Sequence, residues 1–307
     1  MKRRILFSSL ILAVLAAVCV AHGAAPSATP AAAPPAAPLA AAPSLPDLAQ
    51  QHGLSLAMAD NTVDLSTDET VDVLLEGQQL SMNGAPVGSV AEIIKKQRLQ
   101  RLDDLFIALK AYREAWKTAH PSVDFPGVLL LWLDENTPVL TAKSIFQTAA
   151  FAGYPNLSFA VHPRLNPAAL ARVNADAFVP APPDSEHVSL RDPFTFHVHA
   201  EPGHDLTLEW KLSGKAIRTA SVAERAELGA TAFPLLAKRA TDEWIAHGGH
   251  RTSYDRAFDQ AFVHVANELT VKTLIALMDA VCAPTRDFEW HDENAEVPSF
   301  NITLPVN

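Results

Sequence analysis

The pattern of apolar and polar positions predicts alternating strands and helices between residues 70 and 161. "TVDVLLEG" (70–77) alternates like a half-buried strand, and Asn83-Gly84 is a strong signal for a hairpin turn. The apolar run at 128–133 is typical of a strand that is covered on both faces. The segments expected are, in order, a strand, a hairpin, a helix, a strand, a helix and a strand: 70–77, 79–87, 89–117, 128–133, 141–152 and 157–161.

Two of these helices carry boundary signals. Ser89, followed three residues later by Glu92, predicts a capping box at the start of the long helix. Gly153 follows the second helix, at the position where a left-handed residue commonly ends one.

The same order of elements recurs between residues 194 and 306. The corresponding segments are 194–200, 206–212, 215–222, 234–245, 261–265, 273–281 and 300–306. A repeat period above about 100 residues indicates duplicated domains, although two unrelated α+β stretches can share an element order by chance. We therefore expect an α+β protein of two similar ββαβαβ-type modules, each a sheet with helices on one face. Their expected limits are 47–165 and 194–307, with an interdomain linker at 166–193.

The first residues have the layout of an export signal. Lys2, Arg3 and Arg4 precede an apolar run at 5–20, and small residues then allow cleavage after Gly23. The alternative is an uncleaved signal anchor, for which the run is short of the roughly 20 residues that a spanning helix needs. We expect a signal peptide or signal anchor at 1–23 and an extended Ala/Pro-rich linker at 24–46.

Composition and charge narrow the function. The chain is 49% hydrophobic and 19% charged, as in ordinary soluble proteins, and its formal net charge is −10. No basic patch stands out, so a nucleic-acid partner is not expected. Cys282 is the only cysteine after the leader, which excludes an internal disulfide and suggests a buried thiol.

A resemblance to a known family rests on four segments of the first module. They are "LSMNGAPV" (80–87), a long helix, "VLLLWLDENTP" (128–138) with Asp134 after the strand, and "AGYPNLSFAV" (152–161). This pattern resembles the periplasmic domain of the ExbD/TolR family, the small subunits of proton-driven biopolymer transport and Tol envelope complexes. The second module resembles a divergent copy, with Asn267 in the place of Asp134 and "MDAV" (278–281) in its second helix.

The resemblance implies a periplasmic module that binds a protein partner or the cell wall, in a Gram-negative-type bacterium. Family members resemble one another in an acidic residue within the membrane helix, whereas residues 5–20 contain no Asp, Glu, His, Lys or Arg. The resemblance therefore extends to binding and not to proton relay. It also implies partners from a proton-driven transport or Tol-type complex, or peptidoglycan. A tandem pair would correspond to a covalent pseudo-dimer, and membrane anchoring and homo-oligomerisation stay open.

Histidines form the one unusual cluster of polar residues. His197 and His199 alternate on one expected strand and so face the same side, and His204 and Asp205 follow in a short loop. Imidazoles at this spacing can bind zinc or copper, which makes a periplasmic metal-binding protein the alternative function. The competing interpretation is a solvated strand face with incidental histidines.

Sequence motifs for catalysis are missing. The chain has no nucleophile elbow, phosphate loop or dinucleotide fingerprint, so we expect a non-catalytic protein without a cofactor. The expected interaction site is a free sheet edge formed by the last strand (299–307), through Phe300, Ile302 and Leu304, together with Asp134.

Overall fold

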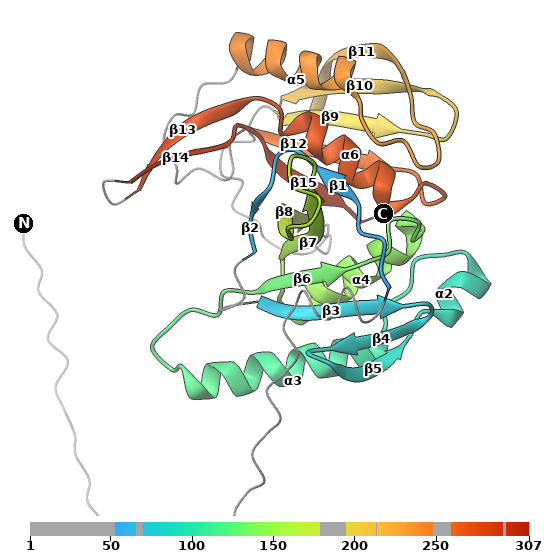
Figure 1. Cartoon of the computed structure of the whole chain (residues 1–307), viewed down its shortest axis with the longest axis vertical. Helices are drawn as coiled ribbons and strands as arrows, with labels where there is room; N and C mark the ends of the chain where they lie inside the picture. Colours follow the sequence, from blue (N-terminus) through green and yellow to red (C-terminus); the bar gives the residue numbers. More distant parts are fainter. Residues whose placement is uncertain are drawn as a thin grey trace, which may run out of the picture. The chain divides into compact units, whose positions relative to one another are not determined.

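The computed structural model describes residues 53–65, 70–178, 195–212, 214–247, 259–290 and 293–306. The expected leader (1–23) and Ala/Pro-rich linker (24–46) lie outside these residues, and so does the 179–193 part of the expected interdomain linker. The described residues belong to one compact unit, Ala42–Asn307, with a mixed α+β fold (Figure 1).

The described part of the chain contains five helices, none of which has the length and apolar character needed to cross a membrane. They are α2 (Ala91–Lys96), α3 (Asp103–Ala119), α4 (Val139–Ala152), α5 (Pro234–His247) and α6 (Val271–Val281). The strands up to residue 178 are β1 (Met58–Ala59), β2 (Val63–Asp64), β3 (Thr70–Glu76), β4 (Gln79–Met82), β5 (Ala85–Ser89), β6 (Val128–Trp132), β7 (Asn156–Pro163) and β8 (Ala171–Phe178). The later strands are β9 (Thr195–Ala200), β10 (Asp205–Leu212), β11 (Lys215–Arg225), β12 (Gln260–Val265), β13 (Thr285–Trp290), β14 (Glu293–Pro298) and β15 (Asn301–Pro305).

One large sheet organises these strands, with β8 in its middle. From β8 the order is β7-β6-β3-β4-β5 on one side and β15-β12-β9-β10-β11 on the other. On each side the first three strands run parallel and the last two join antiparallel as a hairpin extension. The two halves also agree in register, because in each half the first residues of the three parallel strands lie directly opposite one another. These residues are Thr70, Val128 and Asn156 in the first half and Thr195, Gln260 and Asn301 in the second.

The two faces of the sheet differ in what covers them. One face packs against α3, α4, α5 and α6 in a single hydrophobic core that takes residues from both halves, such as Leu131 of β6 and Val263 of β12. On the other face of the first half, a smaller cluster joins Leu74 and Trp132 to Leu56, from the segment that precedes β1. Both faces of β6 are therefore apolar and buried, as the run at 128–133 predicts.

The expected helix at 89–117 is interrupted. α2 ends at Gln97, which adopts a left-handed conformation (φ 49°), and α3 begins after Leu102. Hydroxyl groups of α4 hold the break, because the backbone N–H of Leu102 donates to Thr148 Oγ1 (3.0 Å). The predicted capping box is absent: Ser89 Oγ accepts from the N–H of Ala91, and Glu92 pairs with a lysine of its own helix.

Five strands have no counterpart in the sequence prediction: β1, β2, β8, β13 and β14. β8 forms within the expected interdomain linker, where it becomes the strand that joins the two halves. The hairpin of β13 and β14 stands as a separate two-stranded sheet after α6. The expected hairpin at Asn83-Gly84 is present, and both residues have positive φ, as a type I′ turn requires.

Candidate metal centre

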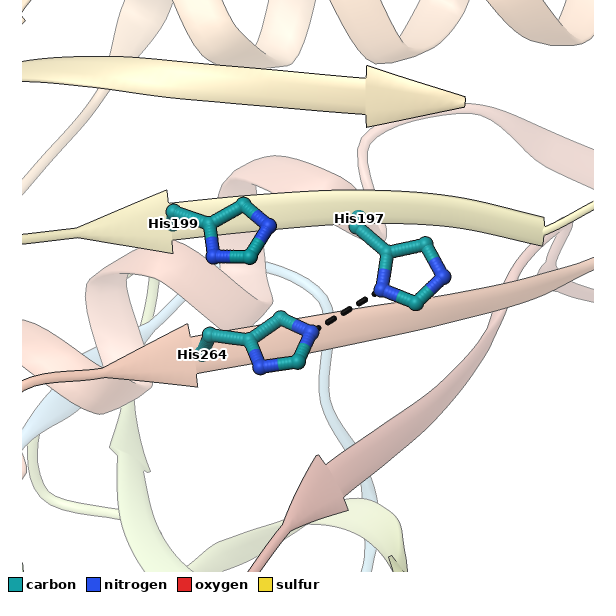
Figure 2. A group of neighbouring side chains, drawn as sticks. All are labelled: His197, His199 and His264. Carbon is teal, nitrogen blue, oxygen red and sulfur yellow. Dashed lines mark hydrogen bonds between the residues drawn. The ribbon is translucent and has the colours of Figure 1, made fainter. Parts of the chain in front are cut away.

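Three histidines meet on the face of the second-half sheet opposite the core. β9 and β12 are parallel neighbours, and alternation along them turns Val198 and Val263 into the core. The intervening positions carry His197 and His199 on β9 and His264 on β12, side by side (Figure 2). Their ligand nitrogens all lie within 4.8 Å of one another.

A hydrogen bond already links two of the rings. His197 Nδ1 and His264 Nε2 are 2.9 Å apart, so one of these nitrogens carries the proton that the other accepts (Figure 2). The second nitrogen of His197 lies 2.9 Å from Thr195 Oγ1. His199 stacks on His264 with ring centroids 4.3 Å apart.

Burial keeps these imidazoles neutral. His197 is 7% exposed, and loss of hydration lowers its pKa to about 4, with a further contribution from the charge of Lys211. Loss of hydration likewise lowers the pKa of His264 to about 3, and the two other histidines lower it further. The pKa of His199 is lowered by burial and partly restored by Glu209. Neutral imidazole is the form that binds metal ions.

Side chains of β10 and β12 complete the surroundings. Glu209 Oε2 lies 3.6 Å from His199 Nε2 and 2.9 Å from Lys211 Nζ. Phe262 stacks on His197 with ring centroids 4.7 Å apart. The cluster therefore has a carboxylate that can orient one imidazole and an aromatic wall that limits the access of water.

The same registers in the first half hold a different polar pair. Asp72 on β3 and Trp132 on β6 occupy the registers that His197 and His264 occupy on β9 and β12. Trp132 Nε1 donates to Asp72 Oδ1 (3.1 Å), and burial raises the pKa of this carboxyl. Each half therefore has a diagonal hydrogen bond between neighbouring strands at this register, but the partners are imidazoles only in the second half.

His204 and Asp205, the other expected ligands, do not join the group of three. They lie around the turn between β9 and β10 and line a surface hollow of about 840 Å³, together with His199 and Glu268. Asp205 faces Arg225 across 3.7 Å. The ligand that sequence reasoning missed is His264, although "FVHVANE" (262–268) alternates like a strand and offers its histidine on one face.

The residues expected to bind a partner are engaged inside the fold. β15 lies between β12 and β8, so it is an interior strand and not the expected free edge. Phe300, Ile302 and Leu304 are buried in the common core. Asp134 accepts hydrogen bonds from the backbone N–H groups of Ser55 and Asn136, so it stabilises the turn after β6 and ties it to the segment that precedes β1.

Clusters of three or more potential metal-ligating side chains are confined, within the described ranges, to the group of His197, His199 and His264. Neither a protein-family model nor a curated protein matches this sequence.

Proposed function

We propose that this protein binds a divalent transition metal ion, zinc or copper, through His197, His199 and His264. One observation carries the proposal: three neutral imidazoles from adjacent strands present their nitrogens within 4.8 Å of one another. Zinc–nitrogen bonds of about 2.0–2.1 Å in a tetrahedral site place ligand nitrogens about 3.3 Å apart. The 2.9 Å contact between His197 and His264 is shorter than this separation, whereas the three ligand nitrogens as a group lie within 4.8 Å, so the rings have to shift to share one ion.

The environment of the cluster favours an ion over a purely structural stack. Binding of an ion by His197 Nδ1 and His264 Nε2 requires the proton between them to move to the other nitrogen of its ring. A second proton does not compete at neutral pH, because both pKa values lie well below 7. Strands that also carry the core hold the three ligands, so the entropy lost on binding is small. Three protein ligands leave one coordination position for water or another ligand.

Calorimetric zinc titration of chelator-stripped protein tests this function. We expect one zinc ion per chain, and His264→Ala should weaken binding by at least about tenfold, because it removes one of three ligands. His120→Ala, which removes an exposed histidine of the α3 end, should bind zinc as the wild type does. No heat of binding in the wild type, or unchanged binding in His264→Ala, would reject the proposal.

A second pair of variants distinguishes the three-histidine group from the ligand set expected from the sequence, which includes His204 and Asp205. His204→Ala and Asp205→Ala should leave zinc affinity unchanged, because both residues lie outside the three-histidine group. A loss of affinity in these variants, with none in His264→Ala, would instead favour the ligands expected from the sequence.

A second candidate function is supported by the repeated strand order. We propose that the two halves are duplicated modules resembling the periplasmic domain of the ExbD/TolR family, exported to the cell envelope as a non-catalytic binding protein. Matching strand order and register support the duplication. So does a reciprocal exchange between the halves, in which Val139 N–H donates to Leu269 O and Val271 N–H donates to Thr137 O, each at 2.8 Å.

Envelope binding has to use an edge other than β15. The strands at the two ends of the sheet are β5 and β11, and β11 exposes Ile217 (58%) beside Lys215 and Thr219. An added strand would pair with such an edge through main-chain hydrogen bonds.

Crosslinking in intact cells tests the envelope function. We expect recovery of a proton-channel subunit or of peptidoglycan, and N-terminal sequencing of the recovered chain should show whether the leader is cut. Ile217→Asp should lower recovery, whereas Ile245→Asp, at an even more exposed position on α5 (77%), should not. Equal recovery from both variants would rule out the β11 edge.

A further inference from the structure

The large sheet opens between its two halves. β15 pairs with β8 only through Thr303–Pro305, opposite Asp176–Phe178. At its other end β8 pairs with β2 instead, where Arg172 lies opposite Val63. Between these two pairings, β8 and β15 diverge and a cavity of about 430 Å³ lies between them.

Apolar side chains form much of the cavity wall. They come from β7, β8, β15, β2 and the β13–β14 hairpin, and include Leu157, Val173, Ile302, Val63 and Val297. The volume lies within the range of roughly 300–1,000 Å³ that is usual for small-molecule sites. Several strands fix the walls, so the cavity does not depend on a mobile loop.

The charge of the lining has one sign. Among the described residues that line it, the charged ones are two arginines, Arg172 of β8 and Arg286 of β13, and none is acidic. Asn174 adds a polar contact, since its Oδ1 accepts a hydrogen bond from Ser158 Oγ (2.8 Å), which leaves the amide nitrogen as a donor. The polar part of the lining is therefore suited to an anion.

Arg172 supplies the strongest indication of a ligand. Its Nε is buried and has no hydrogen-bond partner among the described residues. A guanidinium group cannot lose its proton in a protein, and a buried donor without an acceptor is costly. A ligand carboxylate that accepts from this nitrogen would remove the cost, because planar carboxylates match the fork of donors on arginine.

We propose that this cavity binds a small organic acid, with its carboxylate on Arg172 and its apolar part against Val63 and Val297. The site is separate from the candidate metal centre, since none of the three histidines lines it. Binding here ties together β2, β8 and β15, so the ligand also stabilises the joint between the two halves of the sheet.

Octanoate and octanol, which differ at the head group, are the probes for this site. Octanoate should raise the melting temperature of the purified protein in a concentration-dependent way, and octanol at the same concentrations should not. An equal shift with octanol, or no shift with octanoate, would overturn the proposal without the need for any variant. Inorganic phosphate should produce no shift, and a shift as large as that of octanoate would overturn the requirement for an apolar part.

Variants then test the role of Arg172. Calorimetry on Arg172→Met should show octanoate affinity reduced by at least about tenfold, because a charged hydrogen bond is lost while the apolar stem is kept. Arg98→Met, at an exposed position between α2 and α3, should bind like the wild type. Wild-type affinity in a folded Arg172→Met variant would overturn the assignment of this residue.

Discussion

Among single residues, burial decides what the histidines do. His197 and His264 are hydrogen-bonded on a sheet face where hydration is lost, so their charged forms are disfavoured. Exposed histidines at the same spacing would titrate near neutral pH. Protons would then compete with a metal ion for each imidazole nitrogen. Their position in the fold therefore keeps these imidazoles in the neutral form, which the proposed metal ion would require.

The lowered pKa values predict a dependence of stability on pH. In the unfolded chain the histidine pKa is about 6.5, whereas in the folded chain the pKa is about 4 for His197 and about 3 for His264. Between these values the unfolded state binds more protons than the folded state, so stability is fully present above pH 6.5 and is lost as the pH falls toward 4. In the presence of a chelator, the urea concentration at the midpoint of unfolding should therefore be lower at pH 4.5 than at pH 7.

A variant isolates this contribution from that of the carboxyl groups. The double variant His197→Gln with His264→Gln should show a smaller fall in midpoint between pH 7 and pH 4.5 than the wild type. His120→Gln should keep the wild-type fall. An identical fall in all three proteins would contradict the assignment.

At the scale of elements, the end of α4 shows how a helix boundary depends on its neighbour. Gly153 caps α4 in a left-handed conformation (φ 93°), and its N–H donates to Ala149 O and Ala150 O. A Cβ built on Gly153 would lie 2.6 Å from Arg113 Nη1 of α3. The cap is thus also a contact site between two helices.

Gly153→Ala should destabilise the protein by about 1–3 kcal/mol, because it combines an unfavourable left-handed conformation with displacement of the Arg113 guanidinium. Chemical denaturation measures this loss. Gly229→Ala is the matched control, since Gly229 is also left-handed (φ 76°) but its Cβ would meet nothing within 4 Å. Equal losses in both variants would show that the contact with Arg113 contributes nothing.

On the scale of the whole molecule, the two halves share one core. The hydrophobic cluster on the helix-covered face runs through both halves, and Lys272 pairs with Glu135 across them at 3.0 Å. β8 pairs with strands of both halves, so neither half can complete its sheet alone.

This shared core predicts a single unfolding transition. Leu131→Ala and Val263→Ala remove buried side chains at matching registers of the two halves. Each substitution should lower the free energy of the same unfolding transition by about 2–4 kcal/mol. Calorimetry should give equal calorimetric and van't Hoff enthalpies. Two transitions, each sensitive to only one of the substitutions, would mean that the halves unfold independently.

Much of the local structure was predictable from short-range patterns. Alternation located β3, β9 and β10, the apolar run located β6, and Asn83-Gly84 located the β4–β5 hairpin. The interruption of the helix at 97–102 was not predictable, because it depends on hydroxyl groups of α4 that are distant in sequence. Of the three-histidine group, His197 and His199 were predictable from their spacing, whereas His264 was not joined to them.

The sequence alone determined the elements, because side-chain periodicity and turn chemistry act over a few residues. Tertiary structure decided which elements became neighbours. Parallel pairing of β9 with β12 brought His264 to His199, and insertion of β8 turned the last strand from an edge into the interior. Such pairings depend on contacts between residues far apart in the chain, for which local periodicity carries no signal.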